Sequence, residues 1–162
     1  MRLTLAFALC MVVARMVPAQ AGLLSENSNY LSCLSASCTS LSLSSSTLTG
    51  TIPTELGTVQ ELTKLNFYSN TLVGTIPTEL GSLTRLTELN LYSNLLTGKV
   101  PTELGSLTRL VSKAAFGKNS LTGSIPSELG KLSAVVYFTL YDTSVSGTIP
   151  WQLSALTAMT HL

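Results

Sequence analysis

The sequence is poor in the residues that carry catalytic chemistry. Its 162 residues include one histidine, His161, one tryptophan and three cysteines, and only 10% of them are charged. No serine, cysteine or carboxylate is spaced around His161 as a nucleophilic site requires, and neither a phosphate-binding loop nor a set of metal ligands is present. We therefore expect no enzyme, no metal site and no cofactor.

Strong charge of either sign is also lacking. Removal of residues 1–21 also removes Arg2 and Arg15. The rest of the chain then has seven basic and eight acidic residues, a net charge of about −1. A chain so close to neutral, without a basic patch, is not expected to bind nucleic acid. Beyond the first 21 residues, no apolar run is long enough for a membrane helix.

The start of the chain is typical of a secretory signal. Arg2 is followed by an apolar run from Leu3 to Ala14 and by Ala19-Gln20-Ala21, which fits a cleavage site. Residues 1–21 are therefore predicted to be a signal peptide, and the protein to be secreted and extracellular. The alternative is an uncleaved anchor, which would hold the protein at the cell-surface membrane.

Two cysteines remain once the predicted signal, with Cys10, is removed. An even pair in an exported chain suggests a disulfide between Cys33 and Cys38. Two free thiols are the alternative, because Cys38 also falls on a position that leucine occupies elsewhere. Residues 22–37 are predicted to form a short N-terminal cap.

A Gly-x-Ile/Val-Pro motif, called the phrase below, recurs through the rest of the chain. It begins at Gly50, Gly74, Gly98, Gly123 and Gly147, in steps of 24, 24, 25 and 24 residues. A period of this length indicates a stacked-repeat solenoid, in which each copy buries its apolar face against its neighbours. Before each phrase, apolar residues alternate as in Leu65-x-Phe67 and Leu89-x-Leu91, which predicts a half-buried strand.

Other repeated positions are assigned structural roles. Asparagines just after the strand predict a ladder of side-chain amides that bond the backbone of their own and adjacent coils: Asn70, Asn94 and Asn119. Thr143 and Ser46 replace asparagine in the outer coils, which should be less well held.

Proline followed two residues later by glutamate predicts short helical or 3₁₀ segments, with the proline at a first helical position. The row of glutamates formed by Glu55, Glu79, Glu103 and Glu128 is interpreted as a solvated face; metal binding is the less favoured alternative.

The pattern Leu-x-x-Leu-x-Leu-x-x-Asn-x-Leu-x-Gly-x-Ile-Pro, plainest over residues 86–101, resembles the plant-type leucine-rich repeat. The resemblance covers residues 38–162, as about five repeats with the last incomplete. It implies a right-handed α/β solenoid with a concave parallel β-sheet and short 3₁₀ or helical segments on the convex side. It also implies an extracellular recognition module.

The repeat fails in two places. The fourth copy has an extra residue between Leu110 and Ala114, and Ala114 is smaller than the usual leucine, so this coil is predicted to be a soft point. The last coil is predicted to lack a cap. Its Leu153, Leu156 and Met159 would then form an open edge that favours self-association.

Residues that flank the strand leucines should face outward from the concave sheet. Tyrosine, which concentrates in recognition surfaces, is expected in one column at Tyr68, Tyr92 and Tyr141, with Gly117 leaving a gap before the last. The neighbouring positions complete the candidate ligand-binding set: Asn66, Asn90, Lys64 and Glu88. The alternative is a plain sheet surface, since cross-strand aromatic pairs also stabilise strands.

The sequence predicts an exported recognition module that binds a protein, a peptide or a glycan through this face. Two alternatives stay open: the ectodomain fragment of a membrane-bound receptor kinase, and an inhibitor of an extracellular hydrolase. A purely structural surface protein is a further one. Residues 77–86 and 101–110 are identical, so the surface would suit a repetitive ligand.

Overall fold

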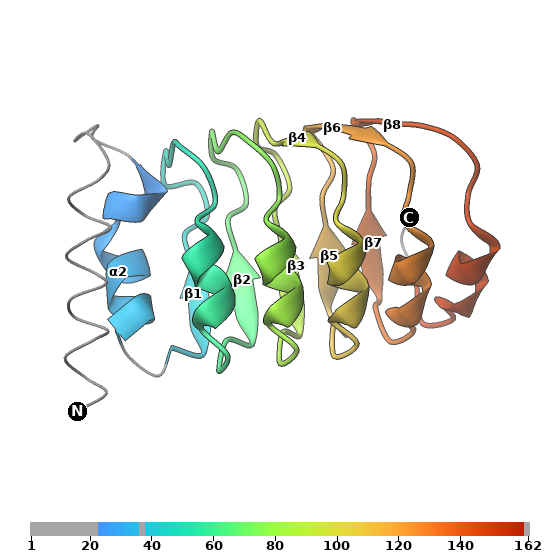
Figure 1. Ribbon diagram of the computed structural model, residues 1–162, viewed down its shortest axis with the longest axis horizontal. Helices are drawn as coiled ribbons and strands as arrows, with labels where there is room; N and C mark the ends of the chain where they lie inside the picture. Colours follow the sequence, from blue (N-terminus) through green and yellow to red (C-terminus); the bar gives the residue numbers. More distant parts are fainter. Residues whose placement is uncertain (1–22, 36–37, 161–162) are drawn as a thin grey trace.

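The computed structural model describes residues 23–35 and 38–160. The predicted signal peptide and His161 lie outside these residues. The described chain winds as a solenoid in which successive coils stack side by side, with 3₁₀ helices on one side and a sheet on the other (Figure 1). This confirms the predicted leucine-rich-repeat architecture.

Each full coil contributes one short strand to a parallel sheet. Its order is β1-β2-β3-β5-β7, so strands from consecutive coils are neighbours. The middle residue of each strand points into the core and lies beside its equivalent in the next coil, because one register is kept throughout. The strands are β1 (Ser40–Ser42), β2 (Lys64–Asn66), β3 (Glu88–Asn90), β5 (Lys113–Ala115) and β7 (Tyr137–Thr139).

A second parallel sheet runs along another edge of the solenoid and was not predicted from the sequence. Its order is β4-β6-β8, with strands β4 (Thr97–Gly98), β6 (Ser120–Gly123) and β8 (Ser144–Val145) (Figure 1). Bridges between Thr51 and Val73 and between Thr75 and Thr97 extend the same pairing toward the N-terminal coils. The repeated glycine lies in these segments at φ between 76° and 98°, a conformation that side chains disfavour.

The convex side is a row of five-residue 3₁₀ helices: η2 (Thr54–Thr58), η3 (Thr78–Ser82), η4 (Thr102–Ser106), η5 (Ser127–Lys131) and η6 (Trp151–Ala155). The repeated proline lies one residue before each helix, in extended conformation, so its predicted place at the first helical position is wrong. The glycine inside each of the helices η2 to η5 permits close stacking. A Cβ at Gly81 would lie 2.5 Å from the carbonyl oxygen of Glu103 in the next coil.

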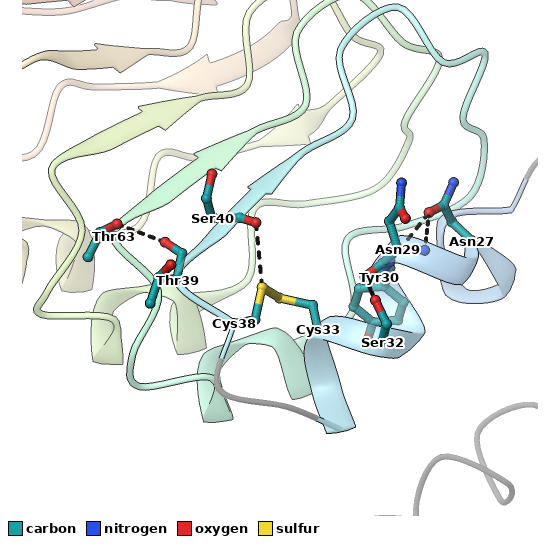
Figure 2. The surroundings of a disulfide bond; sticks show 9 residues. All are labelled: Asn27, Asn29, Tyr30, Ser32, Cys33, Cys38, Thr39, Ser40 and Thr63. Atoms are coloured by element: carbon teal, nitrogen blue, oxygen red, sulfur yellow. Dashed lines mark hydrogen bonds between the residues drawn. A yellow bond between two sulfur atoms is a disulfide. The ribbon is translucent and has the colours of Figure 1, made fainter.

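The N-terminal coil is covered by 3₁₀ helix η1 (Leu24–Glu26) and helix α2 (Ser28–Ser35). The side chain of Asn27 accepts hydrogen bonds from the backbone N–H groups of Asn29 and Tyr30, at 3.0 and 3.3 Å, which caps the helix start. A disulfide joins Cys33 of the helix to Cys38, just before β1 (Figure 2). Tyr30 is fully buried beneath this cap.

Buried asparagines join consecutive coils. The Nδ2 group of Asn94 donates to the carbonyl oxygens of Phe67 and Leu91, at 2.9 and 3.1 Å, and its Oδ1 accepts from the N–H of Leu72 at 3.1 Å. Asn70 and Asn119 make the same kinds of contact. At Thr143 the hydroxyl instead donates to Leu140 within its own coil, at 2.6 Å.

The extra residue of the fourth coil is absorbed just before β5. The N–H groups of Val111 and Ser112 both donate to the carbonyl oxygen of Thr87, at 3.3 and 3.1 Å. The register with β3 is then regular from Lys113 onward. The core position of Ala114 lies beside Phe138, whose ring packs edge-on against Phe116 with centroids 6.2 Å apart. The large Phe138 is buried next to the small Ala114, and the soft point stays a prediction.

Candidate binding surfaces

The register of the main sheet sets three columns of side chains on its exposed face, here called the concave face. The first column runs from Lys64 through Glu88 and Lys113 to Tyr137. The next runs from Asn66 through Asn90 and Ala115 to Thr139. The third, just past the strand ends, contains Tyr68, Tyr92, Gly117 and Tyr141.

The tyrosines of the third column are in contact. The rings of Tyr68 and Tyr92 are stacked, with centroids 5.8 Å apart and planes 19° apart. The rings of Tyr92 and Tyr141 lie 5.5 Å apart at 57°, and their hydroxyl oxygens are 2.5 Å apart. The sequence predicted that Gly117 would leave a gap before Tyr141; the two rings instead meet across it.

Gly117 is what permits this contact. A Cβ at this position would lie 3.4 Å from two carbons of the Tyr92 ring and 2.8 Å from the carbonyl oxygen of Tyr141. Any larger residue would therefore crowd both neighbours. Because Gly117 has no side chain, Tyr92 and Tyr141 come into contact although their coils are not neighbours.

Two lysines lie against the tyrosine rings. The ammonium of Lys113 is 5.2 Å from the ring centre of Tyr137, and that of Lys118 is 5.7 Å from the ring centre of Tyr92. These are distances at which a cation is attracted to a ring face. The sequence analysis missed Lys118, because it follows the strand in a left-handed turn, at φ 48°, and not in the alternating pattern.

The two predicted asparagines hold the backbone beneath the tyrosines. The Oδ1 atoms of Asn66 and Asn90 accept from the N–H groups of Tyr68 and Tyr92, at 3.0 and 3.2 Å. Asn90 is only 5% exposed. These amides therefore position the tyrosines, and Asn90 has little surface of its own.

A pocket of about 240 Å³ opens among these side chains, here called the tyrosine pocket. Ala115 lines the pocket at the repeat position that Asn66 and Asn90 occupy in two other coils. The smaller side chain leaves room that asparagine would fill. The lining residues are Tyr68, Asn90, Tyr92, Lys113, Ala115, Tyr137 and Tyr141.

The contact between two phenols alters one ionisation. The hydrogen bond that Tyr141 shares with Tyr92, followed by desolvation and nearby negative charge, raises the pKa of Tyr141 from 10.0 to about 12. Tyr141 therefore keeps its proton throughout the physiological range. Tyr141 therefore offers a hydroxyl group to a ligand.

A second surface follows the smaller sheet. Hydroxyl side chains flank the repeated glycines on this edge and form what we call the threonine strip: Thr49, Thr51, Thr71, Thr75, Thr97, Ser120, Thr122, Ser124, Ser144, Ser146 and Thr148. Val73, Leu95 and Lys99 interrupt it, and Lys99 is the one charged residue in this set. The hydroxyls of Thr71, Thr97 and Thr122 donate to carbonyl oxygens of the preceding coil, at 2.9, 3.3 and 3.4 Å.

The acidic row on the convex side shows ordinary local contacts. The hydroxyl that begins each of the helices η2 to η5 donates to the carboxylate that follows it, as Thr78 does to Glu79 at 3.2 Å. Within residues 23–35 and 38–160, no three His, Cys, Asp or Glu side chains come together as a metal site requires. In the same part of the chain, no helix has the length and apolar character needed to cross a membrane.

Apolar surface is exposed at the C-terminal coil. Ile149 and Trp151 are 71% and 79% exposed and line a pocket of about 330 Å³. The residues that the sequence placed at the open edge line the same pocket: Leu153, Leu156 and Met159. Leu156 is buried and the other two are half-buried, so Ile149 and Trp151 are the more exposed part of this surface.

Comparisons with known proteins identify the repeat. Residues 61–83 and 85–107 match the sequence profile of the Leucine Rich Repeat family. The plant peptide hormone receptor RGFR1, solved in complex with RGF2, is 38% identical with a TM-score of 0.67, over 69% of this chain and 18% of that one. The BIR2 ectodomain from Arabidopsis thaliana is 36% identical with a TM-score of 0.66, over 70% of this chain and 59% of that one. The chain is a plant-type leucine-rich-repeat protein.

This leucine-rich-repeat protein also resembles a plant ice-binding protein. The two are 28% identical with a TM-score of 0.69, over 76% of this chain and 40% of that one. A search of curated protein sequences finds no match. The chain spans less than two thirds of each of these three solved structures.

Proposed function

We propose that this leucine-rich-repeat protein is an exported recognition module that binds a protein or peptide through the tyrosine cluster of its concave face. The cluster carries the proposal: Tyr68, Tyr92 and Tyr141 form one contiguous surface from three coils. Tyr68 and Tyr141 are 41% and 47% exposed. Large, rigid aromatic side chains with a polar tip are the residues that dominate binding energy at interfaces. The resemblance to RGFR1, solved with a peptide partner, supports the same class of ligand.

The orientation of the rings favours a peptide over a glycan. A sugar packs best on an open ring face, but the facing sides of Tyr68 and Tyr92 are stacked on one another. Lys118 lies over the Tyr92 ring as well. The cluster therefore presents ring edges and hydroxyl groups, which suit the hydrogen-bonding groups of an extended peptide.

The test is selection of peptides from a phage-displayed random library on the secreted chain. Recovered peptides should bind in solution, and Tyr68→Ala/Tyr92→Ala should weaken them by about tenfold or more, as loss of aromatic hot spots does. Val73→Ala, on the threonine strip, is the matched control and should change nothing. Equal binding by the double tyrosine variant would exclude this surface as the site.

We propose that the module acts outside the cell, either as a secreted protein or as part of a receptor ectodomain. The signal-like residues 1–21 and the resemblance to the BIR2 ectodomain support this setting. The 3′ end of the transcript separates the two forms. A reading frame that continues into a membrane helix would exclude the free secreted form.

A second function, ice binding, is favoured by the threonine strip together with the resemblance to a plant ice-binding protein. The strip repeats hydroxyl groups at the spacing of parallel strands, about 4.8 Å. Hydroxyls such as those of Thr71 and Thr97 are held by the backbone of the preceding coil, so they can order water in a fixed pattern. A nearly uncharged surface also leaves that pattern undisturbed.

Ice affinity of the purified chain tests this second function directly. The protein should enter a slowly growing ice front and limit recrystallisation, and Thr97→Lys/Thr122→Lys should abolish both effects. Thr84→Lys, an exposed position beyond the strip, is the control for added charge. Exclusion of the unaltered protein from ice would reject the function.

A further inference from the structure

The tyrosine pocket exists because one coil departs from the repeat. Where regular coils carry asparagine and tyrosine on the concave face, the fourth coil carries Ala115 and Gly117. These two small residues form a depression between a coil with Asn90 and Tyr92 and a coil with Tyr137 and Tyr141. The first coil also carries small residues at these positions, Ser42 and Ser44, but it has no tyrosine-bearing coil on each side.

Groups that donate hydrogen bonds dominate the lining. The Oδ1 atom of Asn90 already accepts from the N–H of Tyr92, at 3.2 Å, so the side-chain N–H groups of Asn90 are the ones left for a ligand. Tyr92 and Tyr141 share one hydrogen bond, which leaves the proton of one hydroxyl to donate outward. Lys113 contributes an ammonium to the same pocket.

Positive charge lies on both sides of the tyrosines. Lys113 is held against Tyr137 and Lys118 against Tyr92. Two carboxylates lie close by without lining the pocket: Glu88, opposite Lys113 in the sheet, and Asp142, next to Tyr141. A cationic ligand would find ring faces already occupied by ammonium groups and would be repelled by them. A carboxylate in the pocket meets the ammonium group of Lys113 and the free donors, and Lys118 lies outside the lining.

We infer that the tyrosine pocket is a subsite for a carboxylate side chain of a bound peptide. The inference rests on the proposed peptide-binding function and names the chemical class that the concave face selects. In this arrangement the ammonium of Lys113 and the amide of Asn90 bond the carboxylate, while the tyrosine hydroxyls bond its second oxygen or the adjacent peptide backbone. Lys118 adds long-range attraction, so affinity falls as salt concentration rises.

The experiment compares peptide libraries selected on three proteins. The unaltered chain should enrich peptides with an aspartate or glutamate at one fixed position. Lys113→Gln/Lys118→Gln should lose this enrichment, whereas Lys131→Gln, which removes a lysine from the convex helix η5, should keep it. For a selected peptide, replacing its acidic residue with the matching amide should weaken binding about tenfold or more, as expected for a hydrogen-bonded charge.

A second variant tests the shape of the pocket. Ala115→Asn restores the residue of the regular coils, so it should fold normally by circular dichroism yet weaken acidic peptides as strongly as the lysine variant. Ser42→Ala, at the equivalent position of strand β1 and outside the pocket lining, is the control. Peptides that bind the unaltered chain equally well as acid and as amide would overturn the inference and leave peptide binding intact. Recovery of no peptide at all would reject the proposed function together with the inference.

Discussion

Each ladder asparagine serves several backbone groups that would otherwise be buried without a partner. Asn94 alone bonds Phe67 and Leu72 in the preceding coil and Leu91 in its own. A polar side chain at 6% exposure is tolerated here because its donors and its acceptor are all paired. The Asn94 side chain therefore joins the two coils by hydrogen bonds, and its removal leaves backbone groups without a partner in both coils.

Replacing Asn94 with alanine should lower the free energy of unfolding by about 3 kcal/mol, because the N–H of Leu72 and two carbonyl groups lose their partner in the interior. Urea unfolding followed by circular dichroism measures the change. Asn29→Ala, on the exposed side of helix α2, should cost far less. Similar losses from both substitutions would contradict the bracing role.

The hydroxyl pair of Tyr92 and Tyr141 predicts an unusual titration. Since the hydrogen bond shared with Tyr92 is the main cause that raises the pKa of Tyr141 to about 12, Tyr92→Phe should bring that pKa back toward 10.0. The fold favours protonated Tyr141, so its contribution to stability is complete below pH 10 and is lost as the pH rises toward 12. Ultraviolet difference absorbance of phenolate follows the titration, and a Tyr92→Phe variant that still has a tyrosine titrating near pH 12 would contradict the assignment.

At the scale of elements, the 3₁₀ helices explain why glycine recurs on the convex side. Four helices each contain a glycine one residue before their end, next to a carbonyl of the following coil: Gly57, Gly81, Gly105 and Gly130. The role of the glycine is to leave room for the backbone of the next coil. It could not be read from a single repeat, because the crowding atom belongs to the next one.

Gly81→Ala should therefore destabilise the stack by about 2 kcal/mol or more, since the added methyl would meet the backbone of Glu103 and force the helices apart. Ser82→Ala, the exposed neighbour in the same helix, should be close to neutral or mildly stabilising. Thermal unfolding of the two variants provides the comparison. A neutral effect of Gly81→Ala would mean that adjacent coils can separate without cost.

The main sheet was predictable from the sequence, whereas the second sheet was not. Alternation at Leu65-x-Phe67 and Leu89-x-Leu91 places the first set of strands, and the 24-residue period stacks them. Strands β4, β6 and β8 have only two to four residues and contain or adjoin a glycine at positive φ, so no alternation marks them. Their pairing arises because stacked coils bring equivalent backbones within reach of one another.

The candidate site was predicted as a column and found as a cluster. Sequence spacing places Tyr68, Tyr92 and Tyr141 on one face, because they share a repeat position. The meeting of Tyr92 and Tyr141 over Gly117 depends on side-chain reach across an empty position, and the approach of Lys118 depends on a left-handed turn. Both are three-dimensional properties of the irregular fourth coil.

At the scale of the whole molecule, the solenoid carries separate surfaces on separate faces. The tyrosine cluster lies on the main sheet and the threonine strip on the smaller one. Each coil contributes to both, yet no side chain is shared between them. Because changes in repeat proteins act mainly on neighbouring coils, the two proposed functions should respond independently to substitution.

The exposed apolar residues of the last described coil predict self-association. Ile149 and Trp151 present the largest exposed fractions among the apolar residues of the described chain, and such patches promote contact between molecules. Sedimentation velocity should show a concentration-dependent increase in size, and Trp151→Ser should reduce it. Val136→Ala, on a smaller exposed side chain, should not. A monomer at all concentrations would exclude this interface.

The double hydrogen bond to Thr87 has a practical consequence. Regular coils use the same shared acceptor, since Thr87 and Glu88 both donate to Thr63; in the fourth coil the two donors lie one residue further from the middle of the strand. The chain thus gains a residue between helix η4 and strand β5 while the strands on either side keep their alignment. This junction therefore accommodates a change in length, and it offers a position at which a short tag can be inserted to follow the protein.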